Sequence, residues 1–457
     1  MLDINDFIAA REGGDPEKVR QSQIKRNESP ALVDEIIELF EIHRKTKYDS
    51  TQIGAELKTV QAGITERKKK GQSDISDLLA QKDEIAKRRA AKEQEADELQ
   101  RQLDAKLKTV GNYVHDSVPV SATEDDNVVV RTWEPATPRA AAAGENLLSH
   151  HQVLARLDGY DPERGTKIAG HRGYCLKGWG LFLNQALINF GLEFLFKKGY
   201  SPNQPPFFME QNYMAKTAQL SQFDEELYKI TENDSDPKYL IATSEQPLSA
   251  LHADEWLQAS DLPIKYAGYS TCFRKEAGKH GHDTWGLFRI HQFEKIEQFV
   301  ICAPEDSWRH YEEMIATSEE FYRALELPHR VVAIVSGALN NAAAAKYDLE
   351  AVFPFQKEYK ELVSCSNCTD YQTRELGIRF GPKRQKGMPD SGRKMYAHAL
   401  NATLCATERT LCCVLENYQT PDGVIVPEVL RKYIPGNLDF LPYTKELAKE
   451  LPLRKKA

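Results

Sequence analysis

Long apolar runs are absent from this 457-residue sequence, which contains no stretch of about 18 uncharged apolar residues. We therefore expect no membrane-spanning helix. The first residues, MLDINDFIAAREGG, carry acidic side chains where a secretory signal carries basic ones followed by an apolar core. The sequence thus predicts a cytosolic protein.

Glycine-rich nucleotide motifs are absent as well. The sequence contains neither a phosphate-binding P-loop nor a dinucleotide fingerprint. If the protein binds a nucleotide, side chains on a sheet must hold it, since no glycine-rich loop at a helix start is available.

Cysteine is sparse, with eight residues scattered through the chain. In a large sequence without a secretory signal, this scatter predicts reduced thiols rather than a disulfide framework. Cys365 and Cys368 form a lone CxxC pair. Two further ligands at similar spacing are lacking, so no zinc is expected. Buried or partly exposed thiols are the favoured interpretation, and metal or redox use is the alternative.

An excess of basic charge is also lacking, because 68 Asp and Glu residues outnumber 60 Lys and Arg residues for a net charge of −8. This balance argues against a protein that binds nucleic acid over its whole surface, but it says little about a local basic patch. The length is sufficient for two or three domains and a large core.

The first 110 residues differ from everything that follows. The stretches 31–64 and 75–110 contain no proline and predict two long helices. Gly71 supplies a chain reversal between them, and Ser73 or Ser76 is the expected cap of the returning helix. The prediction is an antiparallel helical hairpin. Apolar residues recur along it at coiled-coil spacing, namely Ile53, Leu57, Val60 and Ile64, then Leu78, Ile85, Ala96, Leu99, Leu103 and Val110.

This hairpin is rich in basic side chains with acidic ones interspersed. Two interpretations stay open. It is either a solvated coiled coil of mixed charge, or an arm whose bases neutralise phosphates along an RNA backbone. The candidates for RNA contact are Lys68, Lys69, Lys70, Arg88 and Arg89.

The predicted organisation has three parts. Residues 1–112 form the helical arm domain. Residues 113–150, with a strand-like stretch at 128–130 and a Pro- and Ala-rich spacer, are expected to be a linker. Residues 151–457 mix helical patterns with β-rich runs and predict an α+β domain. Within it, the basic Gly/Pro loop 381–394 is either a surface insertion or lies near RNA.

The stretch 273–297, FRKEAGKHGHDTWGLFRIHQFEKIE, is the most informative part of the chain. Arg274 and Glu276 open it, a Gly- and His-rich turn follows, and a second strand-like run carries Arg289 and Glu297. Such a hairpin projects a cation and several carboxylates from rigid strands toward one pocket, which suits a ligand with a phosphate and an amine. A surface ion pair between Arg274 and Glu276 is the alternative.

Four stretches follow one another in a recognisable order: the helix-like run 181–198 with the prolines after it, Thr243-Ser244-Glu245, the 273–297 hairpin, and Asn401-Ala-Thr403 leading to Arg409. Together they resemble the signature motifs of class II aminoacyl-tRNA synthetases. The Thr-Ser-Glu element, the Phe-Glu-Lys-Ile-Glu ending and the basic hairpin narrow the resemblance to seryl-tRNA synthetases of the cytosolic eukaryotic type. It covers essentially the whole chain.

This resemblance implies an α+β catalytic domain built on an antiparallel β-sheet flanked by helices. It also implies a homodimer formed through the 181–198 helix, for which an ordinary core helix is the alternative. The implied reaction activates L-serine with ATP to seryl-adenylate and pyrophosphate, and then transfers the seryl group to the 3′ end of tRNA(Ser). The arm would recognise that tRNA by shape.

The resemblance implies two catalytic arginines. Arg274 would bind the serine carboxylate and the α-phosphate of ATP together, as a planar fork can. Arg409 would cover the adenine ring and meet the γ-phosphate. Glu276 would accept from the adenine amino group, and Phe293 would stack on the purine, although an aromatic residue at such a strand position is more often core.

The resemblance also implies Mg²⁺ at Glu361 and Ser364, because hard oxygen ligands suit this ion. The complete implied ATP-binding set is Arg274, Lys275, Glu276, Ile290, Phe293, Glu361, Leu362, Val363, Ser364 and Arg409.

Serine needs a carboxylate for its ammonium group, for which the resemblance implies Glu245 with Thr243. Its hydroxyl needs a buried acceptor and donor, for which it implies Glu297 and the Asn401/Thr403 pair. A pocket that hydrogen-bonds a hydroxyl rejects analogues that lack it by about 10⁴–10⁵-fold. The third motif, NATLCATER, departs from the usual glycines, which leaves the roles of Asn401 and Thr403 open. The implied serine-binding set is Thr243, Ser244, Glu245, Arg274, Glu297, Asn401 and Thr403.

Two other functions compete with this one. A non-enzymatic descendant that keeps the fold would be expected to have lost its motif arginines and glutamates, yet they are present. An ATP-dependent ligase that charges a carrier protein would not need the basic hairpin.

Overall fold

The computed structural model describes residues 1–71, 74–136, 147–217, 226–231, 236–276, 286–381 and 395–447. The chain forms two compact units, Met1–Tyr113 and Val114–Ala457. In the part of the chain that is described, no helix combines the length and the apolar character needed to span a bilayer.

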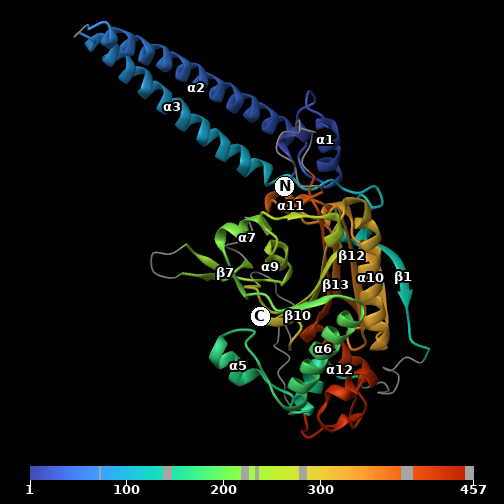
Figure 1. The fold of residues 1–457 in the computed structure, drawn as a ribbon. Helices are drawn as coiled ribbons and strands as arrows, with labels where there is room; N and C mark the ends of the chain where they lie inside the picture. The colour runs from blue at the N-terminus through green and yellow to red at the C-terminus, as the bar shows by residue number, and fades with distance from the viewer. Residues whose placement is uncertain are drawn as a thin grey trace, which may run out of the picture. The chain divides into compact units, whose positions relative to one another are not determined.

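The first unit is helical (Figure 1). A short 3₁₀ helix, η1 (Ile4–Phe7), and α1 (Pro16–Lys25) precede two long helices that lie side by side, α2 (Ala31–Lys69) and α3 (Ser76–Leu107). Gly71 reverses the chain between them in a left-handed conformation (φ +74°), which costs glycine little. The predicted helical hairpin is confirmed.

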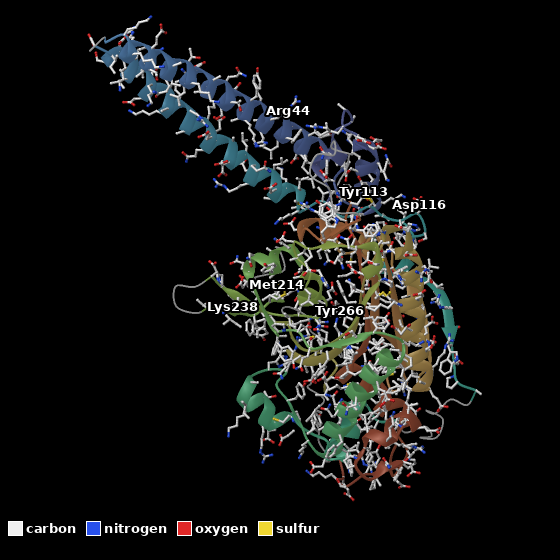
Figure 2. All side chains as sticks on the ribbon, in the orientation of Figure 1. Arg44, Tyr113, Asp116, Met214, Lys238 and Tyr266 are labelled. Atoms are coloured by element: carbon white, nitrogen blue, oxygen red, sulfur yellow. The ribbon has the colours of Figure 1, made fainter. Side chains whose placement is uncertain are left out.

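The predicted seam of this hairpin is largely buried, as Ile53, Ile64, Ile85 and Leu103 show. The seam also holds polar side chains of α2 that periodicity did not indicate, namely His43, Thr46 and Ser50. Elsewhere the helices present their side chains outward, as Arg44 does in Figure 2.

The cap expected at Ser76 is wrong. Ser76 is instead the first residue of α3, and both its backbone N–H and its hydroxyl donate to Asp74 Oδ1, at 3.3 and 2.7 Å. The Asp74 carboxylate, two residues earlier, therefore accepts a hydrogen bond from the first backbone N–H of the helix. Ser73 lies outside the described residues.

The second unit is built on an eight-stranded sheet of the described residues (Figure 1), in the order β1-β11-β12-β13-β15-β10-β9-β4. All neighbouring strands are antiparallel except β4 and β9. The strands are β1 (Val128–Trp133), β4 (Ser201–Asn203), β9 (Ile264–Phe273), β10 (Gln292–Cys302), β11 (His329–Ala333), β12 (Ala345–Phe353), β13 (Glu358–Asn367) and β15 (His398–Ala406).

Three helices pack on this sheet, α6 (Gly178–Lys197), α10 (Ser307–Ala324) and α12 (Thr407–Tyr418). Strand alternation sends Ile296, Gln298 and Val300 of β10 into the core beneath them. The shorter helices are α4 (His150–Arg156), α5 (Pro162–Ala169), α7 (Gln211–Thr217), α9 (Glu245–Ala250) and α11 (Tyr371–Glu375).

The opposite face of β10 is covered too. Leu248 of α9 packs with Phe299 and Ile301 in a second apolar cluster, and Tyr266 of β9, labelled in Figure 2, borders it. Small sheets complete the unit: β5 (Phe208–Glu210) with β7 (Lys238–Leu240) and β6 (Lys229–Ile230), β2 (Tyr160–Asp161) with β3 (Cys175–Leu176), β8 (Trp256–Leu257) with β14 (Arg379–Phe380), and β16 (Gly423–Ile425) with β17 (Phe440–Pro442).

Part of the segment expected to be a linker belongs to the sheet instead. Strand β1 pairs with β11 from Val128 opposite Ala333 to Trp133 opposite His329. Its run of β-branched residues is typical of a strand, and the pairing satisfies its backbone on one side. Most of the Pro- and Ala-rich spacer, and the 381–394 loop from residue 382 onward, lie outside the described residues.

Candidate active site

One cavity of the second unit gathers side chains from the end of β9, from β10, β13 and β15, and from the start of α12. Stretches that lie far apart in the sequence thus converge on one site. The predicted ATP- and serine-binding residues that line it are Thr243, Glu245, Arg274, Glu276, Ile290, Phe293, Glu297, Glu361, Leu362, Ser364, Asn401, Thr403 and Arg409.

Three residues predicted to bind ATP or serine do not line the cavity. Val363 alternates with Leu362 and Ser364 along β13, so its side chain points into the core on the opposite face. Ser244 is fully buried against Gly268 at the start of α9. Lys275 lies at the rim, where its backbone N–H donates to Glu226 O at 3.0 Å.

Arg274 is fixed at the end of β9 by its own backbone. Its N–H donates to His291 O at 2.9 Å, and its carbonyl oxygen contacts His291 Nδ1 at 3.0 Å. The guanidinium carbon lies 5.3 Å from the centre of the Phe293 ring. Glu276 forms its ion pair with Arg289 rather than with Arg274. Arg274 therefore presents its fork within the cavity beside an aromatic ring.

Arg409 makes a second cation–aromatic contact, with its guanidinium carbon 4.8 Å from the centre of the Phe288 ring. Its Nε donates to Phe288 O at 3.2 Å, and its Nη1 donates to Glu361 O at 3.3 Å. Burial lowers the pKa of Arg409, and Glu361 opposes that shift. Two arginines and two aromatic rings thus stand at one end of the cavity.

The other end carries a buried ion pair. Lys295 Nζ lies 2.6 Å from Glu297 Oε2 and 3.4 Å from Thr403 Oγ1, and the Thr403 hydroxyl donates to Glu297 Oε2 at 3.3 Å. Burial raises the pKa of Glu297, whereas Lys295 and Thr403 oppose the shift. The three side chains form a closed triangle of polar contacts at the wall.

A second carboxyl group lies close to this triangle. Burial, followed by the charge of Glu297, raises the pKa of Glu245 to about 7, while Lys295 and Arg274 oppose the shift. At this end of the cavity two carboxyl groups, Glu245 and Glu297, therefore lie near two cations, Lys295 and Arg274. It can accept a ligand that brings a further positive charge to Glu245.

Oxygen donors gather on the neighbouring strands. Glu361 and Ser364 line the cavity, and Asp348 lies opposite Ser364 in the β12–β13 pairing. Asp348 Oδ1 is buried and has no hydrogen-bond partner among the described residues, while Lys346 Nζ lies 3.2 Å from Oδ2. A carboxylate, a hydroxyl and a spare carboxylate oxygen are donors that fit a hard cation such as Mg²⁺.

Several cavity residues were not predicted as site residues, above all Lys295, Phe288, Arg289 and Glu408. Lys295 could have been found, because β10 alternation places it on the same face as Phe293 and Glu297. Phe288 and Arg289 precede β10 in irregular backbone, where no periodicity shows which way a side chain points. The CxxC cysteines, Cys365 and Cys368, are buried and take part in no disulfide.

The arm residues proposed for RNA contact are all exposed on α2 and α3. Three of them take part in surface ion pairs: Lys70 with Glu66 at 2.5 Å, Arg88 with Glu56 at 3.7 Å, and Arg89 with Glu93 at 2.8 Å. Such pairs contribute little to stability, so an RNA phosphate can compete for the bases.

Two family models match the chain. The seryl-tRNA synthetase N-terminal domain matches residues 1–114, and the class II tRNA synthetase core domain (G, H, P, S and T) matches residues 228–418. The cytoplasmic serine–tRNA ligase of Candida albicans is 57% identical over 468 aligned positions, which cover 100% of this chain and 99% of that protein. The chain belongs to the seryl-tRNA synthetase family.

Solved seryl-tRNA synthetases share the fold. The cytoplasmic enzyme of Naegleria fowleri, in complex with AMP, is 46% identical with a TM-score of 0.83 and covers 97% of this chain and 99% of its own. The Pyrococcus horikoshii enzyme, in complex with ATP, is 38% identical with a TM-score of 0.84 and covers 97% and 100%. The resemblance that the motifs indicated is confirmed, and the chain is a class II aminoacyl-tRNA synthetase.

Proposed function

We propose that this seryl-tRNA synthetase activates L-serine with ATP in the cytoplasm and transfers the seryl group to the 3′ end of tRNA(Ser). One observation carries the proposal: a single cavity holds Arg274 together with a carboxylate-rich end at Glu245 and Glu297 and a cation–aromatic end at Arg409 and Phe288. The first end suits an amino acid, and the second suits a nucleotide.

Activation joins two anions. An oxygen of the serine carboxylate attacks the α-phosphorus of ATP, a new P–O bond forms, and the bond to pyrophosphate breaks. Arg274 bridges the carboxylate and the α-phosphate, so positioning and charge neutralisation supply most of the rate gain. The attacking carboxylate is already ionised and needs no general base. In the second step a 3′-terminal hydroxyl of the tRNA attacks the seryl carbonyl carbon, and AMP leaves.

The nucleotide end would hold the adenine between Phe293 and Arg409, with Glu276 accepting from its amino group. Arg289, which pairs with Glu276 here, is placed to meet the phosphates once that pair opens. Glu361 and Ser364 would hold Mg²⁺, with Asp348 as a nearby oxygen donor. When bound, the ion neutralises charge on the phosphates.

The amino-acid end would bind serine by its ammonium group at Glu245 and Thr243. The serine hydroxyl would donate a hydrogen bond to Glu297 and accept one from the side chain of Thr403 or Asn401. Lys295 would hold the Glu297 carboxylate in place. A substrate without a hydroxyl leaves these buried polar groups unpaired, which explains the expected rejection of alanine and glycine.

The arm domain, residues 1–112, would bind the tRNA backbone through exposed bases such as Lys68, Lys69 and Arg88. A homodimer would form through α6, on which Leu181 is 48%, Phe182 42% and Phe196 65% exposed. Burying these side chains against a second copy would remove apolar surface from water.

The test is aminoacylation of a tRNA mixture with labelled serine. The proposal predicts acid-precipitable serine only with ATP present, and loss of charging when the variable arm of tRNA(Ser) is removed. Full aminoacylation by a chain lacking residues 31–110 would contradict the role of the arm while leaving serine activation standing.

A further inference from the structure

Glu408, which is buried, contacts Glu294, a half-buried residue of β10, and the roles above do not use this contact. Glu408, 1% exposed, is the second residue of α12 and directly precedes Arg409. Glu294 lies on β10 between Phe293 and Lys295, the residues that face the nucleotide and amino-acid ends of the cavity. The pair therefore links α12, which supplies Arg409, to β10, which supplies Phe293 and Lys295.

Beyond the end of β15, side chains of α12 take the place of strand pairing with β10. Strand β15 ends at Ala406, which lies opposite Lys295. One residue further along β10, Glu408 Oε2 accepts from the backbone N–H of Glu294 at 2.9 Å, and the Thr407 hydroxyl donates to Glu294 O at 3.4 Å. Two side chains of α12 thus satisfy backbone groups of β10 that a longer β15 would have bonded.

The Glu408 carboxyl group is held on every side. The Tyr174 hydroxyl oxygen lies 3.2 Å from its Oε1, and the Thr407 hydroxyl oxygen lies 3.1 Å from its Oε2. The Glu294 carboxylate lies beside it and accepts from Asn184 Nδ2 of α6 at 3.1 Å. A hydrogen-bonded chain therefore runs from α6 through Glu294 to the start of α12.

A buried carboxyl group beside a second carboxyl group is harder to ionise than an exposed one. Burial, then the hydrogen bond and charge of the Glu294 side chain, raise the pKa of Glu408 well above its usual range. The nearby phenols of Tyr174 and Tyr269 have raised pKa values as well, and a phenol carries no positive charge that could stabilise a carboxylate. Lys295, the adjacent cation on β10, is paired with Glu297 on the cavity side.

We propose that Glu408 is a positioning residue for ATP binding: its carboxyl group docks the first turn of α12 on β10 and so directs Arg409 into the cavity that Phe293 lines. Arg409 then reaches Phe288 O and Glu361 O. The consequence for ATP rests on the proposed function. The docking contact and the proton on Glu408 do not depend on the proposed function.

The proton is tested without any activity measurement. Because the folded protein holds this proton and the unfolded chain releases it, wild-type stability falls as pH rises above the usual carboxyl range. Glu408→Gln keeps the hydrogen-bonding shape but carries no titrating proton. Between pH 5.5 and 8.5, the unfolding constant of the wild type should rise relative to that of Glu408→Gln by up to about tenfold per pH unit.

Two further variants sharpen this comparison. Glu294→Gln removes the second carboxylate, so the pH dependence should weaken as it does in Glu408→Gln. Glu320→Gln alters an exposed glutamate of α10 and should leave the wild-type dependence intact. Identical pH profiles for the wild type and Glu408→Gln would show that Glu408 does not hold this proton.

The docking role is tested by kinetics at pH 7. Glu408→Ala leaves the Glu294 N–H without its acceptor, so the KM for ATP in pyrophosphate exchange should rise about 10- to 100-fold, with the serine KM changed less than about threefold. Glu408→Gln should restore the ATP KM to within about threefold of the wild type. Wild-type ATP binding by Glu408→Ala, or equal loss in both variants, would overturn the role. If the wild type showed no serine-dependent exchange, only the proposed function would fail, since the pH measurement is independent of it.

Discussion

Lys295 is the residue on which the amino-acid end of the site depends most. Its ammonium group contacts both Glu297 and Thr403, and it is buried with them. Removing one partner of such a pair leaves a buried charge uncompensated, at a cost of roughly 3–5 kcal/mol. The ion pair therefore both stabilises the fold and holds the groups proposed to meet the serine hydroxyl.

Lys295→Met should lower the thermal midpoint and raise the serine KM at least about tenfold, with the ATP KM little changed. Adding Glu297→Gln should recover stability without restoring selection of serine over alanine. Lys265→Met, which disrupts an ion pair on the surface end of β9, is the matched control. An unchanged serine KM in Lys295→Met would contradict the assignment.

Glu245, the proposed partner of the serine ammonium group, should give serine binding a pH dependence. Its pKa in the free protein is about 7, raised first by burial and then by Glu297. Because the serine ammonium group needs the ionised carboxylate, the serine dissociation constant should rise by up to about tenfold per unit as pH falls from 7 to 5.5. Calorimetric titration measures this slope. Glu245→Gln should bind weakly with no slope, and a flat wild-type profile would rule the role out.

Among the elements, α6 is the one whose exposed apolar side chains need a partner in the proposed homodimer. Leu181→Glu combined with Phe182→Glu should shift the protein from dimer to monomer in sedimentation at micromolar concentration, because buried charge opposes association. Leu438→Glu, at a comparably exposed leucine outside α6, should leave the dimer intact. A wild-type monomer with full activity would refute the interface.

Residue spacing in the sequence predicted the elements whose formation depends on residues close together in the chain. Seven-residue spacing identified α2 and α3, and the β9–β10 pairing followed from the strand-like runs around the 273–297 hairpin. Long-range contacts were beyond such reasoning. Strand β1 was taken for a linker because its partner β11 lies about 200 residues away. The contact of Glu408 with Glu294 spans 114 positions, and no spacing in the sequence indicates it.

At the scale of the whole molecule, the proposed function assigns tRNA binding to the first unit and the chemistry to the second. Charge reversal by replacing Lys68, Lys69 and Lys70 with Glu should raise the KM for tRNA at least about tenfold. It should also weaken the dependence of this KM on salt concentration, because phosphate contacts are lost. Pyrophosphate exchange should be unaffected. Arg309→Glu, on the exposed face of α10, is the control and should leave both reactions near wild type. Equal effects on exchange and charging would contradict this division.

Serine-dependent ATP–pyrophosphate exchange tests the central claim most directly. The wild type should exchange with serine and not with alanine. The exchange rate of Arg274→Ala should be at least about 10³-fold lower, since the proposed bridge between the serine carboxylate and the α-phosphate is gone. Arg330→Ala, at an arginine of β11 outside the cavity, should retain exchange. No exchange with serine in the wild type, or undiminished exchange in Arg274→Ala, would contradict the account.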